Sequence, residues 1–233
     1  MLPSVSTLAS TSWASFRARY RPLLAISAIM FLPSLVQFIS YPTASDTVPP
    51  SLASGWVLLS LLGFVLQMWG TAALITFVAH PHQPISINEA FNRNTRRLWP
   101  LIWTTLLVAV VVILGLIALI IPGIYLAVAF SFVTFSIVLE DKKGLAALRA
   151  SRALIKDHWW AVFGRFLALG VIIVLAFIVL SIIVGLFTGI ASPAGQVAVN
   201  ATSLVGAIFV TPFSLLYSFA IYSSLTTHHH AHA

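Results

Sequence analysis

Long apolar runs separated by short polar segments form the dominant pattern along this chain. Crossing a bilayer takes about 20 apolar residues in a helix. On this basis the sequence predicts spans at about residues 22–41, 55–79, 99–121, 124–139, 159–190 and 203–225. Shorter, partly polar helices are predicted at about residues 10–21, 86–98 and 143–158. The prediction is therefore an all-α polytopic membrane protein. Its six transmembrane helices form three helical hairpins, each preceded by a short interfacial helix.

Composition narrows the class further. The chain has 233 residues, of which 60% are hydrophobic and 7% are charged, whereas soluble domains carry about 25% charged residues. A soluble globular protein is excluded, and no loop is long enough for a separate soluble domain. We expect a single six-span membrane domain over residues 1–225 and a His-rich tail over residues 226–233.

The basic residues predict the orientation. All 12 Lys and Arg lie before the first, third and fifth spans or just inside the fifth, while segments 42–54, 122–123 and 191–202 contain none. The positive-inside rule then places both termini and the interfacial helices in the cytoplasm. The net charge of +7 is explained by topology and lipid headgroups, so no nucleic-acid partner is predicted. Arg165, about 9 Å into its helix, is expected to extend back to the headgroups.

The segment 86–98 carries the signals of a helix start. Ser86 followed by Glu89 matches a capping box. Glu89, Arg93 and Arg97 then recur at i, i+4, with the acid N-terminal to the bases, which is the favourable order.

The segment 143–158 predicts a lipid-facing helix. Leu145, Leu148, Ile155 and Trp159 fall on one side, beside Arg149, Arg152 and Lys156, and alanines occupy the other side. Apolar groups at the headgroup boundary beside basic groups that meet phosphates are typical of interfacial helices. Arg149, Arg152 and Lys156, with Arg93 and Arg97, are the candidate sites for anionic headgroups. A solvated cytoplasmic loop helix is the alternative interpretation.

Trp99, Trp159 and Trp160 are the predicted interfacial anchors.

Between the third and fourth spans, Pro122 and Gly123 predict a tight hairpin turn near the outer surface. Proline presets one backbone dihedral, and glycine permits a positive φ.

One stretch of about 50 residues, from Leu116 to Phe163, resembles a known family. It contains Ile-Pro-Gly-Ile-Tyr at 121–125, a span that ends in Glu140, the pattern Ala-Leu-x-x-Ser-x-x-Leu at 147–154, and the pair Trp159-Trp160. These features resemble the bacterial multi-spanning family named after the membrane domain of glycerophosphoryl diester phosphodiesterase. The resemblance implies a bacterial cytoplasmic membrane protein and supplies no enzyme, because the phosphodiesterase domain is not this membrane domain.

Catalytic and metal signatures are weak. The sequence has no cysteine, no Gly-rich phosphate loop, no GxSxG elbow and no HExxH. The His-rich tail at 228–232 is able to bind metal ions as neutral imidazole, but nothing beside it orients the ligands. A low-complexity end or a remnant of an added sequence explains the tail as well. We therefore predict no enzyme, no metal site and no cofactor.

Two functional hypotheses follow. The first is a non-catalytic scaffold, assembly factor or accessory subunit of a membrane complex, whose partners are anionic lipids and other membrane-protein subunits. The second is a transporter or lipid-handling protein for a neutral or lipidic molecule, with Gln67 and polar residues of the sixth span lining a cavity. Ordinary interhelical hydrogen bonds are the competing explanation for those polar residues.

Overall fold

The computed structural model describes residues 3–40, 53–80, 85–189 and 192–231. Every regular element in these ranges is a helix. The helices are α1 (Val5–Ala18), α2 (Tyr20–Ser40), α3 (Ala53–Ala79), α4 (Ile87–Thr95), α5 (Leu98–Ala118), α6 (Ile120–Ala129), α7 (Val133–Glu140), α8 (Leu145–Ile155), α9 (Trp159–Thr188) and α10 (Pro193–Ala231).

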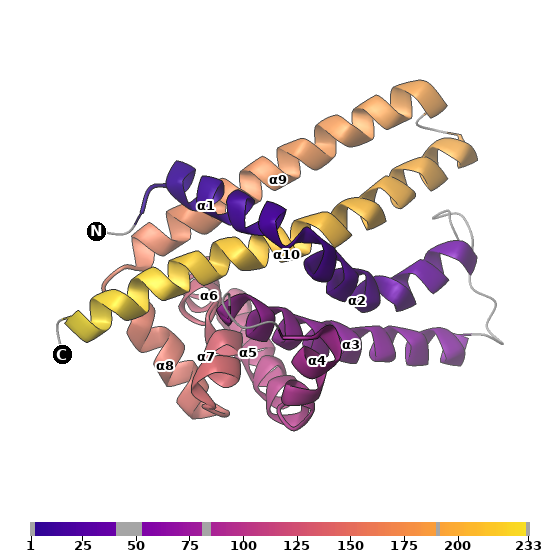
Figure 1. Cartoon of the computed structure of the whole chain (residues 1–233). Helices are drawn as coiled ribbons and strands as arrows, with labels where there is room; N and C mark the ends of the chain where they lie inside the picture. Colours follow the sequence, from indigo (N-terminus) through magenta and orange to yellow (C-terminus); the bar gives the residue numbers. More distant parts are fainter. Residues whose placement is uncertain (1–2, 41–52, 81–84, 190–191, 232–233) are drawn as a thin grey trace.

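Six helical segments within the described ranges are long and apolar enough to cross a membrane. They are α2, α3, α5, the α6–α7 segment, α9 and most of α10. Consecutive spans pair as hairpins, with α2 along α3, α5 along α6 and α9 along α10 (Figure 1). This arrangement confirms the predicted all-α fold with three hairpins, preceded in turn by the short helices α1, α4 and α8.

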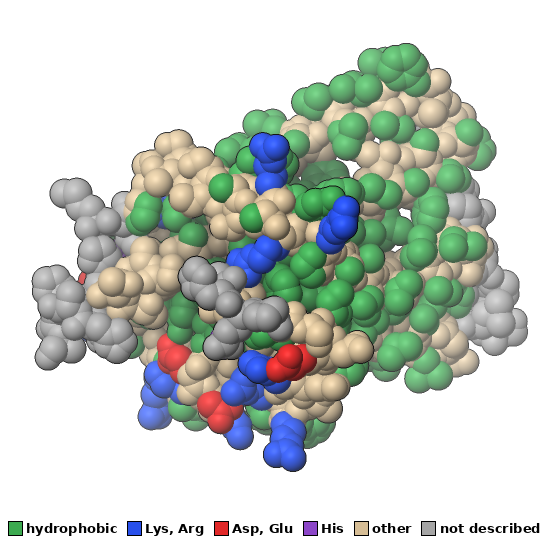
Figure 2. Space-filling view, in the orientation of Figure 1, with side chains coloured by type: hydrophobic (Ala, Val, Ile, Leu, Met, Phe, Trp, Pro, Cys, Tyr) green, Lys and Arg blue, Asp and Glu red, His purple; other side chains and the backbone are tan. Residues whose placement is uncertain are grey.

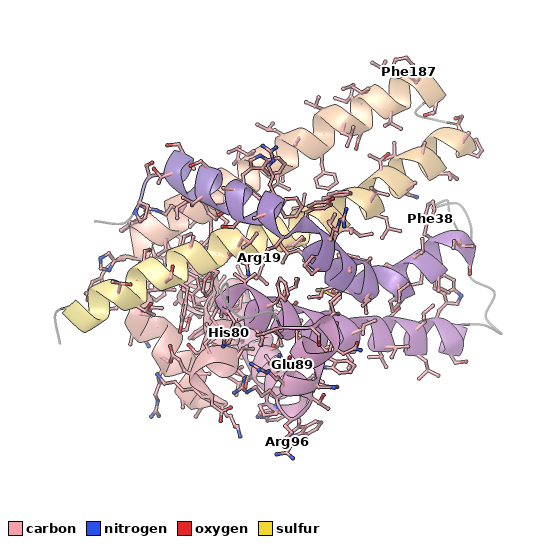
Figure 3. All side chains as sticks on the ribbon, in the orientation of Figure 1. Arg19, Phe38, His80, Glu89, Arg96 and Phe187 are labelled. Atoms are coloured by element: carbon pink, nitrogen blue, oxygen red, sulfur yellow. The ribbon has the colours of Figure 1, made fainter. Side chains whose placement is uncertain are left out.

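Charge is concentrated at one end of the molecule. Figure 2 shows Lys, Arg, Asp and Glu side chains gathered over α4, α7 and α8, with further basic side chains around α1, while apolar side chains dominate the opposite end. Arg96 and Glu89 mark the charged end, and Phe38 of α2 and Phe187 of α9 mark the apolar end (Figure 3). The segregation by side that the charge pattern predicted is therefore a property of the fold.

The fourth span is broken, which the sequence pattern did not predict. Helix α6 ends at Ala129 and α7 begins at Val133, although 120–140 is one apolar run. Helix α7 is 8 residues long, and α8 then folds back beside it. The reversal is made at Asp141 (φ 55°) and Gly144 (φ 53°), both in left-handed backbone conformations.

The turn between the third and fourth spans lies earlier than predicted. The chain reverses at Leu119, whose backbone is extended (φ −163°, ψ 140°), and Pro122 and Gly123 lie inside the first turn of α6. Proline is tolerated there because the first helical N–H groups have no intrahelical acceptor. Gly123 has no positive φ. It is needed instead for close packing, since a Cβ on Gly123 would lie 2.7 Å from the backbone nitrogen of Leu116.

The tip of the α5–α6 hairpin was expected near the outer surface, and the structure places it elsewhere. Trp159, the first residue of α9, donates its indole N–H to the carbonyl of Tyr125 (3.2 Å). Helix α9 has 30 residues, so its far end is about 45 Å away. The tip therefore lies beside the beginning of α9 and not at the apolar end. The physical reason is the fold-back of α7 and α8, which returns the chain to the level of Tyr125 before α9 starts.

Two predicted boundaries shift most. Helix α1 runs Val5–Ala18, where 10–21 was predicted, because Ser4 caps it by accepting from the N–H of Thr7. Helix α10 begins at Pro193, ten residues before the predicted 203, because Ser192 caps it and accepts from the N–H of Gly195. It runs to Ala231, so much of the predicted tail 226–233 is helical. The side chains of residues 228–233, and with them the histidine tract, lie outside the described residues.

Candidate functional site

One buried serine joins helix α8 to the broken fourth span. Ser151 is fully buried and donates its hydroxyl to the carbonyl of Ala129 (2.8 Å), and it accepts from the N–H of Phe132 (3.2 Å). These two backbone groups are the ones freed by the break between α6 and α7. Irregular backbone at membrane depth must find such partners within the protein. Ser151 thus fixes which face of α8 looks outward.

The outward face of α8 carries three cations. Ala147, Leu148, Ser151 and Ile155 are buried, whereas Arg149, Arg152 and Lys156 are exposed. Within the described residues these three cations make no ion pair and no side-chain hydrogen bond. The predicted division of faces was wrong in part, because Leu148 and Ile155 pack inward and Ala146 and Ala153 are exposed. The serine contact rotates the helix relative to the simple apolar-face prediction.

The other two predicted headgroup residues are already engaged. Arg93 pairs with Glu89 at 2.6 Å, at the predicted i, i+4 spacing. Arg97 donates to the carboxylate of Asp141 (3.1 Å) and to the carbonyl of Val138 (2.6 Å), which ties the beginning of α5 to the end of α7. The structure therefore separates the five predicted cations. Arg149, Arg152 and Lys156 are unpaired among the described residues, Arg93 is paired within its own helix, and Arg97 links α5 to α7.

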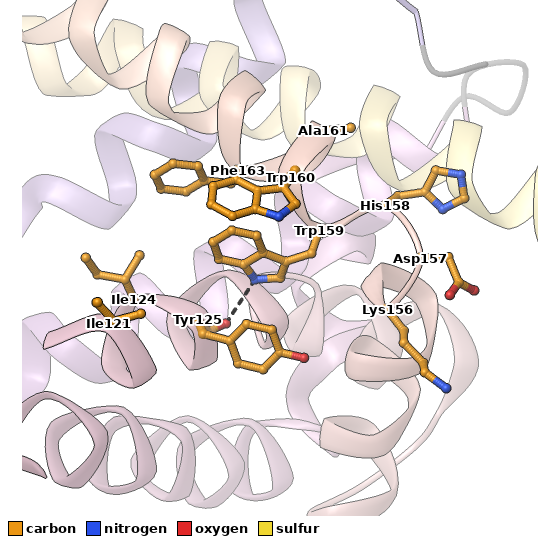
Figure 4. Close-up of a pocket in the computed structure, with 10 residues that line it drawn as sticks. All are labelled: Ile121, Ile124, Tyr125, Lys156, Asp157, His158, Trp159, Trp160, Ala161 and Phe163. Carbon is orange, nitrogen blue, oxygen red and sulfur yellow. Dashed lines mark hydrogen bonds between the residues drawn. The ribbon is translucent and has the colours of Figure 1, made fainter. Parts of the chain in front are cut away.

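An aromatic pocket adjoins the row of cations on α8. It has a volume of about 730 Å³ and lies between the beginning of α6 and the beginning of α9 (Figure 4). Most of its wall is apolar and aromatic, with Tyr125 stacked on Trp159 at a centroid distance of 5.5 Å, and Asp157 and His158 add a carboxylate and an imidazole to the lining beside Lys156. Lys156 stands at its edge. The pocket thus joins an apolar surface to an unpaired ammonium group.

The three predicted tryptophan anchors do not behave alike. Trp99 is 74% exposed and Trp160 is 78% exposed, at the starts of α5 and α9. Trp159 is turned inward, where it bonds to Tyr125 and stacks on Phe163 with a centroid distance of 5.2 Å. Trp159 therefore positions α9 against α6, and it is not a free anchor.

A second cavity lies between hairpins, deeper in the apolar region. It has a volume of about 350 Å³ and is lined by hydroxyls from three helical segments, namely Thr71, Ser131, Thr134, Thr211, Ser214 and Ser218. The hydroxyl of Ser131, at the α6–α7 break, is buried and has no partner among the described residues. Gln67, which sequence reasoning placed in such a cavity, is not among the lining residues.

Several polar contacts at the charged end join residues that are far apart in the sequence and were not predicted. Asn94 of α4 is fully buried and donates to the hydroxyl of Thr76 on α3 (2.8 Å). Tyr222 of α10 donates to Glu140 at the end of α7, and Lys142 pairs with the same carboxylate at 2.7 Å. Arg165 was expected to reach headgroups, but it donates to the carbonyl of Pro3 (2.7 Å), just before α1. Spacing along the sequence carries no signal for contacts between such distant residues.

The hairpins and the charged end define a multi-pass helical membrane protein. The chain belongs to the family of a domain of unknown function, DUF7847, which matches residues 48–225. The match covers more than half of the chain, including the broken span, α8 and the aromatic pocket.

Two bacterial relatives carry the name UPF0259 membrane protein. The one from Sodalis glossinidius (strain morsitans) is 32% identical over 131 residues, which cover 56% of this chain and 51% of the relative. The one from Pectobacterium carotovorum subsp. carotovorum (strain PC1) is 30% identical over 109 residues, 47% of this chain and 43% of the relative. The chain thus spans about half the length of the curated relatives it matches. No solved structure shows significant similarity to it.

These matches refine the resemblance drawn from the motifs. They support a bacterial membrane-protein family, and they do not support the phosphodiesterase name. The relatives' names assign no catalytic activity.

Proposed function

We propose that this protein is a non-catalytic membrane protein that binds anionic phospholipid through α8 and the adjoining aromatic pocket. In this role it acts as a scaffold, assembly factor or accessory subunit of a membrane complex. The observation that carries the proposal is the row Arg149, Arg152 and Lys156, unpaired within the described residues and leading to the pocket of Tyr125, Trp159 and Trp160.

Each part of a phospholipid has a matching surface at this site. Phosphate oxygens suit Arg and Lys, which gain about 1 kcal/mol per residue near an anionic membrane surface. The glycerol and the first acyl carbons suit the apolar and aromatic wall, as in other interfacial sites. Arg149, Arg152 and Lys156 are spaced i, i+3 and i+7, so the three cations lie along one side of α8 and its C-cap.

The test is lipid retention in detergent micelles. The protein is purified with and without Arg149→Gln, Arg152→Gln and Lys156→Gln together, mixed with equal phosphatidylglycerol and phosphatidylcholine, and examined by native mass spectrometry. The triple variant should retain at least about tenfold less phosphatidylglycerol. A control that removes the same charge elsewhere, by Arg17→Gln, Arg96→Gln and Lys143→Gln, should retain more. Equal retention by both variants would refute the proposal.

The pocket is tested separately with a matched pair of exposed tryptophans. Trp160→Ala removes a ring from the pocket, and Trp103→Ala removes one from α5, where Trp103 is 55% exposed. Only the first substitution should weaken retention of both lipids. If the two variants behave alike, the pocket has no part in lipid binding.

The accessory role is supported by the uncovered apolar faces of α5 and α9, and it needs its own test. Purification in mild detergent followed by protein mass spectrometry should recover a stoichiometric membrane-protein partner. This part of the proposal would fail if the protein purified alone and had the same size before purification, in the solubilised membrane, as afterwards.

We also propose that the charged end faces the cytoplasm of a bacterial cytoplasmic membrane. The positive-inside rule supports this orientation. Because the sequence contains no cysteine, a thiol reagent labels an introduced cysteine and no other residue of the chain. A maleimide that does not cross membranes should label Lys143→Cys in inverted vesicles and Thr188→Cys in intact cells. The opposite labelling would reverse the orientation.

A second candidate function, handling of a neutral or lipidic molecule, is favoured by the hydroxyl-lined cavity. Its lining has no charged side chain, and the hydroxyls come from α3, α10 and the broken span. Broken helices that line cavities are common at transporter binding sites. Replacing Thr134→Val and Ser214→Ala should reduce cross-linking of a photoreactive diacylglycerol, while Ser181→Ala on α9 should not. Unchanged cross-linking in the double variant would exclude this function.

A further inference from the structure

A small cavity lies beneath α1 at the charged end. It has a volume of about 230 Å³ and is enclosed by α1, α10 and the end of α3. Its polar lining consists of Thr11, Ser12, Ser15, Arg19 and Ser223. Ser12, Ser15 and Arg19 are spaced i, i+3 and i+7, so they share one face of α1 and its C-cap. The volume is well above the ~30 Å³ that one water molecule occupies.

Two hydroxyl donors in this cavity are uncommitted. Ser12 is 2% exposed, and its hydroxyl has no partner within the described residues. The hydroxyl of Ser15 likewise makes no hydrogen bond within the described residues. By contrast, Thr11 donates to the carbonyl of Thr7 (2.8 Å) and Ser223 to that of Ala220 (3.1 Å). A buried hydroxyl without a partner costs about 1–3 kcal/mol, so a ligand that accepts from Ser12 would be favoured.

The cation of the cavity also lacks a counterion. Arg19 donates to the carbonyl of Phe77 (3.4 Å) and lies 5.6 Å from the centre of the Phe77 ring. None of the ion pairs among the described residues includes it. Burial lowers the pKa of the Arg19 guanidinium, although arginine stays protonated in proteins. A partly buried cation without a carboxylate favours an anion beside it.

We propose that this cavity binds a phosphate oxyanion, with Arg19 as the charge partner and the hydroxyls of Ser12 and Ser15 as donors. Charge-assisted bonds from arginine and hydroxyl groups are the usual means of holding phosphate oxygens. The site is separate from the α8 surface and does not rest on the proposed function. Arg19 directly precedes α2, so the phosphate is that of a phospholipid headgroup or free inorganic phosphate from the adjacent water.

The test compares two neighbouring arginines. Arg19→Gln and Arg17→Gln remove the same charge, but Arg17 is exposed and does not line the cavity. The full-length protein in maltoside micelles is titrated with inorganic phosphate at constant ionic strength and, separately, with phosphatidic acid. Binding is followed by thermal unfolding, because a ligand of the native state raises the melting temperature. Arg19→Gln should weaken binding at least about tenfold, and Arg17→Gln should not.

A second variant guards against misfolding of the first. Ser12→Ala removes a buried hydroxyl that has no partner in the described structure, so without ligand it should raise the melting temperature or leave it no lower, while it weakens binding. Loss of affinity for phosphatidic acid alone assigns the site to a phospholipid, and loss for both probes assigns it to free phosphate. Either result supports the proposal. Wild-type protein that binds neither probe, or Ser12→Ala and Arg19→Gln variants that bind like wild type, would overturn it. The Arg149, Arg152 and Lys156 triple variant should still bind at this site.

Discussion

Helices α4 and α8 occupy corresponding places in the fold and differ in the pairing of their arginines. Both are short and placed before a hairpin, and both insert one buried polar side chain into the bundle: Asn94 from α4 and Ser151 from α8. In α4, Glu89 pairs with Arg93. In α8, residues 145–155 include no acid, and Arg149 and Arg152 have no partner among the described residues.

The difference bears on the proposed lipid site, because a cation that is already paired is less available to a headgroup. Arg93 of α4 and Arg149 and Arg152 of α8 are all exposed, so exposure alone does not distinguish the two helices. An acid four residues earlier does, because it occupies the arginine before a headgroup arrives. Four substitutions test this difference between α4 and α8.

The largest effect is expected where α8 joins the broken span. Ser151→Ala leaves the carbonyl of Ala129 and the N–H of Phe132 without their partner. Each unsatisfied buried group costs about 1–3 kcal/mol, so the free energy of unfolding should fall by about 2–4 kcal/mol. Unfolding in mixed micelles, followed by tryptophan fluorescence, measures the loss. Ser203→Ala is the control, because Ser203 is exposed and bonds within its own helix. An equal loss in both variants would show that the break does not depend on Ser151.

The corresponding substitution in α4 should cost less. Asn94→Ala removes the bond to Thr76 (2.8 Å) and the bond to the carbonyl of Ala72 (3.3 Å). It leaves behind helix carbonyls and the Thr76 hydroxyl, which still donates to the carbonyl of Ala72, and it removes an amide oxygen that has no partner in the described residues. We expect a loss of about 1–2 kcal/mol in the same unfolding assay. Asn92→Ala, an exposed change on the same helix, should cost little, and a greater loss in Asn94→Ala than in Ser151→Ala would reverse the order.

A third substitution gives α8 the acid that α4 has. Leu145 is 58% exposed and lies four residues before Arg149. Leu145→Glu should pair with Arg149 and lower phosphatidylglycerol retention about fivefold, equivalent to the contribution of one basic residue at a membrane surface. Leu145→Gln is the uncharged control. If both variants retain lipid equally, pairing is not what controls access.

The smallest effect is the reverse change in α4. Glu89→Gln frees Arg93 and should raise phosphatidylglycerol retention about twofold, because an exposed i, i+4 pair contributes only about 0.2–0.5 kcal/mol. The same native mass spectrometry measures it. Combining Glu89→Gln with Arg93→Gln should abolish the gain, and a gain that persists in the double variant would have another origin.

Local signals in the sequence were sufficient for much of the fold. Apolar runs predict the six spans, because length and hydropathy are properties of consecutive residues. The Ser86 cap and the Glu89–Arg93 pair follow from spacing within one helix, and the structure confirms both.

The break in the fourth span had no comparable signal. Residues 129–133 read Ala-Phe-Ser-Phe-Val and contain neither proline nor glycine. The backbone groups at the break are bonded by Ser151, 19 residues beyond Phe132, and hydrophobic periodicity does not report contacts at that distance. The same limit explains why the rotation of α8, the inward Trp159 and the cavity under α1 emerge only from the three-dimensional arrangement.

Helix α9 has a consequence for the bilayer that surrounds it. Its 30 residues rise about 45 Å, while a typical hydrocarbon core is about 30 Å thick. Apart from its contact with α10, most of its large side chains are exposed. A helix of this length accommodates by tilting or by locally thickening the membrane. The free energy of unfolding should therefore depend on lipid chain length and be greater in bilayers of longer acyl chains, because α9 then fits the hydrocarbon core more closely.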